Sequence, residues 1–195
     1  MRKHGSSDRV TLEKSETERD LCVQIHKDLR FSQHIETQVN KANRLLGLIR
    51  RSYEHLDAES MQLLFVALVR PHLEFGNVVW SPRLEKDKKL VEGVQRRATK
   101  IIPGLKDLTY EQRLEKMKLP SMCYRRLRGD LIEVFKYTHN IYKLSDSLLE
   151  LETRTNNWGH SYKLRKQRYN TTLWQHFFTQ RIMDRWNSLP EEVAE

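Results

Sequence analysis

Basic side chains, spaced along expected helices and one irregular segment, are the residues of this sequence best suited to chemistry. They form three groups: Lys41, Arg44 and Arg51; Arg96, Arg97 and Lys100; and Lys163, Arg165, Lys166 and Arg168. Lysine and arginine neutralise phosphate oxygens and displace the counterions bound to them. In the third group the charges alternate with tyrosines, whose rings can stack on unpaired bases. These ten residues are candidate phosphate contacts; the alternative is that they only solvate the faces of amphipathic helices.

The net charge of the chain favours phosphate binding. Lysine and arginine number 35, aspartate and glutamate 26, so the formal net charge is +9 over 195 residues. Such an excess indicates a polyanionic partner, nucleic acid first, with an anionic membrane surface as the competing interpretation. The apolar run Leu63–Val69 is followed by charged residues. A membrane-spanning helix needs about 18 or more apolar residues, so we expect no span.

Motifs that would identify an enzyme are missing from the sequence. It contains no Asp-Asp dipeptide, no G-x-S-x-G elbow, no glycine-rich phosphate loop and no H-E-x-x-H helix. Cys22 and Cys123 are the 2 cysteines, without C-x-x-C spacing, which predicts neither a zinc site nor a disulfide framework. We therefore expect no catalytic residue, no metal ligand and no small-molecule substrate. We also expect an intracellular location, with nucleus and cytoplasm both open.

The first half of the chain predicts two helices. Ser32 is expected to cap a helix reaching about Ser52, because apolar residues recur along it at spacings of four and three. Those apolar residues are Ile35, Val39, Ala42, Leu46 and Ile49. Asp57 is expected to cap a central helix that contains Leu63–Val69, buried on nearly all sides. Pro71 predicts a kink or break at Arg70, because proline lacks a backbone donor and disfavours helical geometry before it.

Further caps and breaks divide the second half of the chain. Ser81-Pro82 is expected to open a helix to about Ile101, and Thr109 with Gln112 forms a capping-box pattern. Helices are also expected from Ser121 and over about 172–188, and 144–157 is expected to be a linker. Before all of these, the alternation of residues 21–25 predicts a half-buried strand. The sequence thus predicts a mostly α fold: a helical bundle with a short N-terminal β strand or hairpin. The expected domains are 1–30, 31–143 and 144–195.

Five blocks of this sequence resemble a known protein family in both content and order. They begin at about Arg19 and read ERDLCVQIHKDLRFSQHI, VNKANRLLGLIRR, LVRPHLEFGNVVWSP, VQRRATKIIPGL and FFTQRIMDRWNSLPEEV. Together they resemble the region after the catalytic palm in reverse transcriptases of non-LTR (LINE-type, jockey-like) retrotransposons. The chain departs from that family at Cys22, where the family usually has glycine.

The resemblance implies a thumb-like bundle that grips a primer–template duplex, with residues 1–30 as a remnant of the palm's last strands. The paired aspartates that hold Mg²⁺ in such RNA-directed DNA polymerases have no counterpart here. We therefore expect a fragment that binds an RNA–DNA hybrid or duplex without polymerase activity and without a cofactor of its own. A missing palm domain or another protein chain is a further expected partner. Two alternatives stay open: a helical protein–protein interaction module, and a decayed reading frame without selected function.

Overall fold

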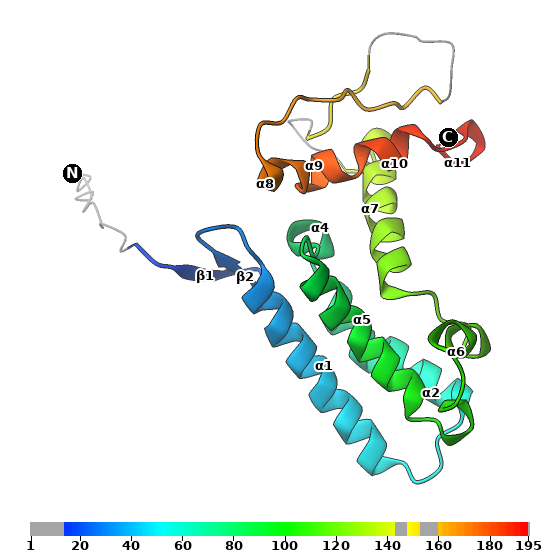
Figure 1. The fold of residues 1–195 in the computed structure, drawn as a ribbon. Helices are drawn as coiled ribbons and strands as arrows, with labels where there is room; N and C mark the ends of the chain where they lie inside the picture. The colour runs from blue at the N-terminus through cyan, green and yellow to red at the C-terminus, as the bar shows by residue number, and fades with distance from the viewer. Residues whose placement is uncertain (1–13, 143–147, 153–159, 195) are drawn as a thin grey trace, which may run out of the picture.

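The computed structural model describes residues 14–142, 148–152 and 160–194. Over these residues the chain is mostly helical, with one antiparallel two-stranded hairpin near the N-terminus (Figure 1). The predicted fold class is therefore confirmed. Two long helices, α1 (Ser32–Ser52) and α5 (Glu85–Lys100), run side by side, and a third, α7 (Met122–Thr138), leads to the C-terminal elements (Figure 1). No helix among the described residues is both long and apolar enough to cross a membrane.

The hairpin consists of β1 (Thr17–Asp20) and β2 (Val23–His26), with Asp20 opposite Val23. The prediction that Leu21 begins a strand is wrong, because Leu21 and Cys22 form the turn. Their φ angles are 42° and 66°, as a tight hairpin turn requires. The turn leaves Leu21 82% exposed, while Val23 is buried.

Helix α1 buries the predicted apolar stripe, but its N-terminus differs from the prediction. All five predicted stripe residues are buried. Ser32 is not the cap, because Phe31 occupies that position and no side chain caps the helix. The Ser32 hydroxyl instead donates to Asp87 Oδ2 at 2.7 Å, which ties α1 to the start of α5.

The central helix runs through α2 (Ala58–Leu64), the π-helical segment η1 (Phe65–Val69) and α3 (Arg70–Glu74). Asp57 caps it as predicted, accepting a hydrogen bond from the Ser60 backbone N–H at 2.7 Å. Of the predicted kink or break at Arg70, the break does not occur, since the helix continues to Glu74; the irregularity is the π-helical segment that ends at Val69. The widened turn comes just before Pro71, and it is a known way for a helix to accommodate a group that cannot donate a regular hydrogen bond.

Burial of the central helix is one-sided, so the prediction of burial on nearly all sides is wrong. Its fully buried face comprises Met61, Phe65, Val69 and Leu73. Leu63 and Leu68 are instead 69% and 46% exposed. Burying only one face is the usual pattern for a helix at the edge of a core.

Capping between the central helix and α7 agrees with the prediction at two of three places. After the short α4 (Asn77–Trp80), α5 begins at Glu85 without a side-chain cap, so the predicted start at Ser81-Pro82 is wrong. Helix α6 (Tyr110–Lys116) follows a short 3₁₀ turn, η2 (Pro103–Leu105), and carries the predicted capping box of Thr109 and Gln112. The helix predicted from Ser121 is α7, and Ser121 is its cap, accepting from the Tyr124 backbone N–H.

Helix α7 joins two hydrophobic cores. Its Met122 belongs to the first core, which α1, the central helix and α5 form, and its Val134 belongs to the second. The predicted C-terminal helix is divided into α8 (Thr172–Gln175), α9 (Phe178–Arg181) and α10 (Met183–Asn187), followed by α11 (Glu191–Ala194). The change of core thus falls within α7, before residue 144. Of the predicted linker, 144–147 and 153–157 lie outside the described residues.

Candidate functional site

A groove of about 400 Å³ follows the contact between the C-terminal halves of α1 and α5. Val91, Val94 and Ala98 form part of the buried face of α5. Arg97 and Lys100 lie beside that face, at the edge directed toward α1. The lining consists of Asn43, Leu46, Gly47, Arg50, Arg97, Lys100, Ile101 and Lys106. Two helices that pack along their apolar stripes therefore bring basic residues from separate parts of the chain together.

The groove is electrostatically one-sided, since its lining has four basic side chains and no carboxylate. Arg97 Nε donates to Asn43 Oδ1 at 3.1 Å, which holds this side chain across the helix contact. Among the described residues, Arg50, Lys100 and Lys106 form no salt bridge. Basic residues around a concave surface reinforce one another's positive potential and attract anions.

Gly47 lies at the α1 side of the groove and keeps it open. A Cβ atom added at Gly47 would meet no other atom within 4 Å, so the backbone of α1 is accessible there. Glycine in an exposed helix interior is less stable than alanine. Helix stability therefore does not explain a glycine at this position, and its effect is to leave space beside the groove.

Arg96 is directed away from this groove, although it neighbours Arg97 in the sequence. Its guanidinium lies over the ring of Tyr110, 4.3 Å from the ring centroid. Successive helix residues point about 100° apart, so Arg96 and Arg97 reach different partners. The second predicted group is thus split, with Arg97 and Lys100 together and Arg96 on another face.

The first predicted group is exposed on α1 but does not line the groove. Arg44 and Arg51 are solvent-exposed, and Lys41 lies toward the hairpin end of the helix. Lys41 is close enough to His34 for its charge to help lower the pKa of that histidine, a shift due first to burial. The groove uses Arg50 instead of its neighbour Arg51.

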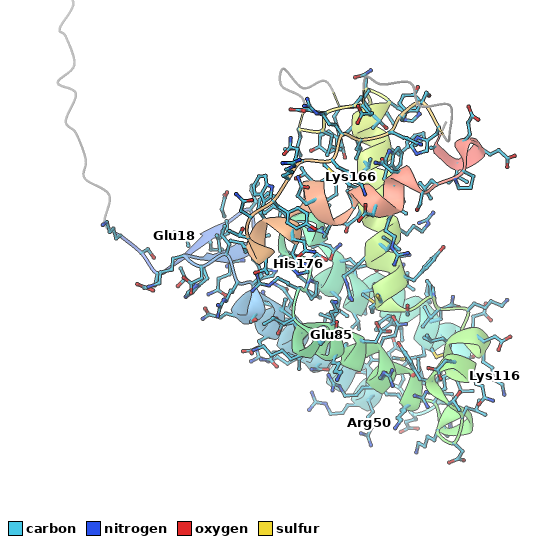
Figure 2. All side chains as sticks on the ribbon, turned by 45° about the horizontal axis from the view of Figure 1, so that its top comes forward. Glu18, Arg50, Glu85, Lys116, Lys166 and His176 are labelled. Carbon is cyan, nitrogen blue, oxygen red and sulfur yellow. The ribbon has the colours of Figure 1, made fainter. Side chains whose placement is uncertain are left out.

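The third predicted group lies in the part of the chain that forms the second hydrophobic core. Arg165 faces Glu150 at 3.5 Å, and Lys166 forms an ion pair with Asp184. The Lys163 carbonyl accepts from the Glu152 backbone N–H at 2.7 Å, and Arg168 is exposed. Figure 2 shows Lys166 and Arg50 near opposite ends of the molecule. The basic segment therefore does not extend the groove.

Sequence reasoning missed Arg50 and Lys106. Arg50 follows Leu46 and Gly47 at helical spacing, so it shares their edge of α1, and this spacing was the available signal. Lys106 carried no such signal, because it follows η2 and reaches the groove only through the turn of the chain after α5.

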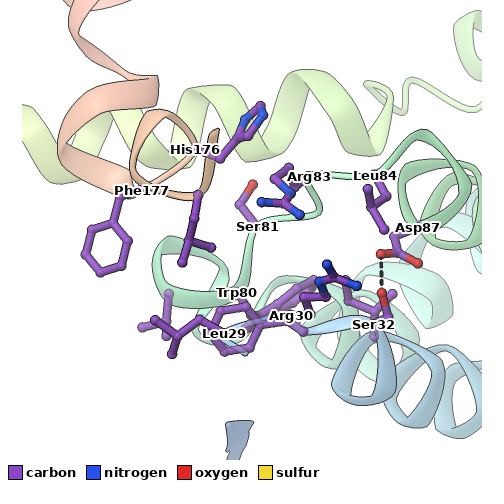
Figure 3. Close-up of a pocket in the computed structure, with 14 residues that line it drawn as sticks. Leu29, Arg30, Ser32, Trp80, Ser81, Arg83, Leu84, Asp87, His176 and Phe177 are labelled. Atoms are coloured by element: carbon purple, nitrogen blue, oxygen red, sulfur yellow. Dashed lines mark hydrogen bonds between the residues drawn. The ribbon is translucent and has the colours of Figure 1, made fainter. Parts of the chain in front are cut away.

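A smaller pocket, of about 50 Å³, lies where the start of α1, the segment after α4 and α8 meet (Figure 3). Figure 3 shows Trp80, Ser32 and Asp87 on one side and His176 and Phe177 on the other. A volume of this size accommodates only a few water molecules. We therefore interpret it as a packing seam between the first core and the segment of α8.

Within the described residues, no three histidine, cysteine, aspartate or glutamate side chains gather into a group that could hold a metal ion. Comparisons of the chain with protein-family models, curated proteins and solved structures found no match.

Proposed function

We propose that this chain binds the phosphate backbone of a nucleic-acid duplex through the groove between α1 and α5. The observation that carries the proposal is the set of four basic side chains around a groove without a carboxylate. The order of sequence blocks that resembles LINE-type reverse transcriptases adds the expectation of a thumb-like fragment bound to an RNA–DNA hybrid. A separate palm domain would then carry out catalysis, and this chain would bind the duplex.

Binding of this kind is independent of base sequence. Each basic side chain that neutralises a phosphate releases counterions, so affinity falls with salt by a log–log slope of about 0.9 per contact on B-DNA. Arg50, Arg97, Lys100 and Lys106 together would give a slope near −3.6 by the same relation. Such contacts position a duplex without reading its sequence.

We also propose an intracellular location. The two cysteines, which are free and exposed, accord with it, because disulfides are rare inside cells.

The test is fluorescence anisotropy of a labelled duplex across a salt series, with both a DNA duplex and an RNA–DNA hybrid. The double variant Arg97→Gln/Lys100→Gln removes two of the groove's charges and keeps side chains that favour helix. We expect its DNA slope to be shallower by about 1.8.

A matched control removes the same number of charges elsewhere. Arg165→Gln/Lys166→Gln changes two residues that already face Glu150 and Asp184. We expect its slope to stay close to that of the unchanged chain. Equal losses in the two double variants would show that net charge alone attracts the duplex, and the groove would be rejected as the site.

A protein–protein interaction module is the second candidate, and one observation favours it. The central helix exposes Leu63 and Leu68, and Phe75, which directly follows it, is 60% exposed. A contiguous apolar patch at a surface often marks a protein interface, and this candidate function requires these residues to form one with a partner chain. Light scattering over a range of concentrations tests this candidate. Association that Leu63→Lys/Leu68→Lys abolishes would support it, whereas a monomer that binds duplex would support the groove.

A further inference from the structure

A second hollow, of about 380 Å³, lies between α4 and the first half of α7. It shares no lining residue with the groove between α1 and α5. Three arginines from one stretch of α7 line it: Arg125, Arg126 and Arg128. A volume in this range is typical of sites for small molecules rather than for single waters.

Arg126 is the unusual residue of this hollow. It is 7% exposed, and its Nη1 is buried without a hydrogen-bond partner among the described residues. Burial lowers the pKa of its guanidinium. Buried arginines are normally paired and hydrogen-bonded, since an uncompensated buried charge is strongly destabilising.

Nearby carboxylates have other partners. Glu74 accepts two hydrogen bonds from Arg125, and Asp130 is held by Arg181 at 2.9 and 3.0 Å. Glu92 accepts from the Tyr110 hydroxyl and from the Met122 and Cys123 backbone N–H groups at the start of α7. These carboxylates act on Arg126 through space, and within the described residues none of them forms a hydrogen bond or an ion pair with its guanidinium.

The rest of the lining also suits an anion. Its other carboxylate, Glu133, accepts from Lys136 at 2.8 Å and from Tyr142 at 2.6 Å, so it is already compensated. Arg128 is exposed and forms no salt bridge within the described residues. Asn77 is 9% exposed and has an amide oxygen without a partner; reversing that amide would present donors instead.

Gly129 provides the space. It lines the hollow in the middle of α7, and an added Cβ would meet no atom within 4 Å. A larger side chain at this position would therefore fill the hollow without a clash at its first atom.

We propose that this hollow binds a phosphate group, with Arg126 and Arg128 compensating its charge. Arginine suits this role because its planar guanidinium donates two parallel hydrogen bonds to a phosphate. The phosphate is carried either by a small free ion or by the 5′ end of a nucleic-acid strand. The site is separate from the duplex-binding groove and does not depend on it.

The experiment is calorimetric titration of the full chain with inorganic phosphate at constant ionic strength. Saturable binding at one site is expected. Arg126→Met should abolish it while keeping the fold, because replacing an unpaired buried charge by an apolar side chain relieves its desolvation. Gly129→Leu should weaken binding at least tenfold, and leucine is a better helix former than glycine.

A matched variant separates this site from the duplex-binding groove. Arg97→Gln/Lys100→Gln should bind phosphate normally, and Arg126→Met should keep the salt slope for duplex. The absence of saturable binding, or equal phosphate affinity in Arg126→Met, Gly129→Leu and the unchanged chain, would overturn the proposal.

Short single strands then identify the carrier. A preference for a 5′-phosphorylated strand over a 5′-hydroxyl strand, lost in Arg126→Met, would assign the site to strand ends. Equal binding of both strands alongside saturable binding of inorganic phosphate would assign it to a free ion.

Discussion

Replacing Arg181 with methionine should detach the C-terminal elements from α7. Arg181, in α9, holds Asp130 of α7 through Nε and Nη2 at 3.0 and 2.9 Å, and its Nη2 also donates to the Val78 carbonyl at 3.0 Å. One guanidinium therefore joins α9, α7 and α4. The side chains of Arg181 and Asp130 are only 15% and 6% exposed, so water compensates little for a lost partner.

The loss should be large and should depend on pH. Removing one member of a buried ion pair costs about 3–5 kcal/mol, because the other charge stays buried and unpaired. Burial already raises the pKa of Asp130, and Arg181 opposes that rise. Without Arg181 the folded-state pKa should rise further, so the folded variant holds a proton that the unfolded chain has released. Acid therefore favours the folded variant, and the penalty should shrink as pH falls from 7 toward 4.

Urea unfolding at several pH values, followed by tryptophan fluorescence and circular dichroism, measures this penalty. Arg185→Met is the matched control, since Arg185 lies one helical turn further along and is exposed. We expect the control to change the free energy of unfolding by about 0.5 kcal/mol at most. Equal losses in both variants, or a penalty independent of pH, would refute the reasoning.

Three further outcomes are expected. Cys22→Gly should raise the free energy of unfolding in urea by about 0.5–1 kcal/mol. Glycine adopts the positive φ of the turn without strain, although the greater backbone entropy of glycine in the unfolded chain offsets part of this stabilisation. A lower free energy of unfolding would show that Cys22 is not strained in the turn. Burial, then Lys41 and Arg19, lower the pKa of His34, so stability should fall as pH drops below 6.5; thermal unfolding of His34→Gln should show a weaker dependence. Gly47→Ala should keep duplex affinity in the anisotropy assay and Gly47→Glu should weaken it; unchanged affinity in both would place the duplex elsewhere.

Local sequence signals predicted the elements whose ends depend on adjacent residues. The caps at Asp57, Thr109 and Ser121 were found because each hydrogen bond closes within a few residues. The stripe of α1 was found because one face of a helix repeats regularly. These features need no knowledge of the rest of the fold.

Tertiary partners decided the features that the sequence did not predict. Ser32 has the chemistry of a cap, but Asp87, far along the chain, takes its hydroxyl. The apolar run of the central helix reads as fully buried, yet the first core covers only one side of it. Pro71 predicts a kink or a break, and the packed helix continues through it with a widened turn just before. In each case the residue type allows several interactions or conformations, and the packing of the fold selects one of them.

The same reasoning explains why charge patterning found only part of the groove. Arg50 and Arg51 are equivalent by composition, and so are Arg96 and Arg97. The packing of α1 against α5 fixes the rotation of each helix and thereby selects Arg50 and Arg97. Tyr110, which follows in the chain, takes Arg96. A basic site between helices is therefore predicted by identifying the apolar stripes first and then choosing the charges one position beyond their edges, rather than by counting charges in sequence.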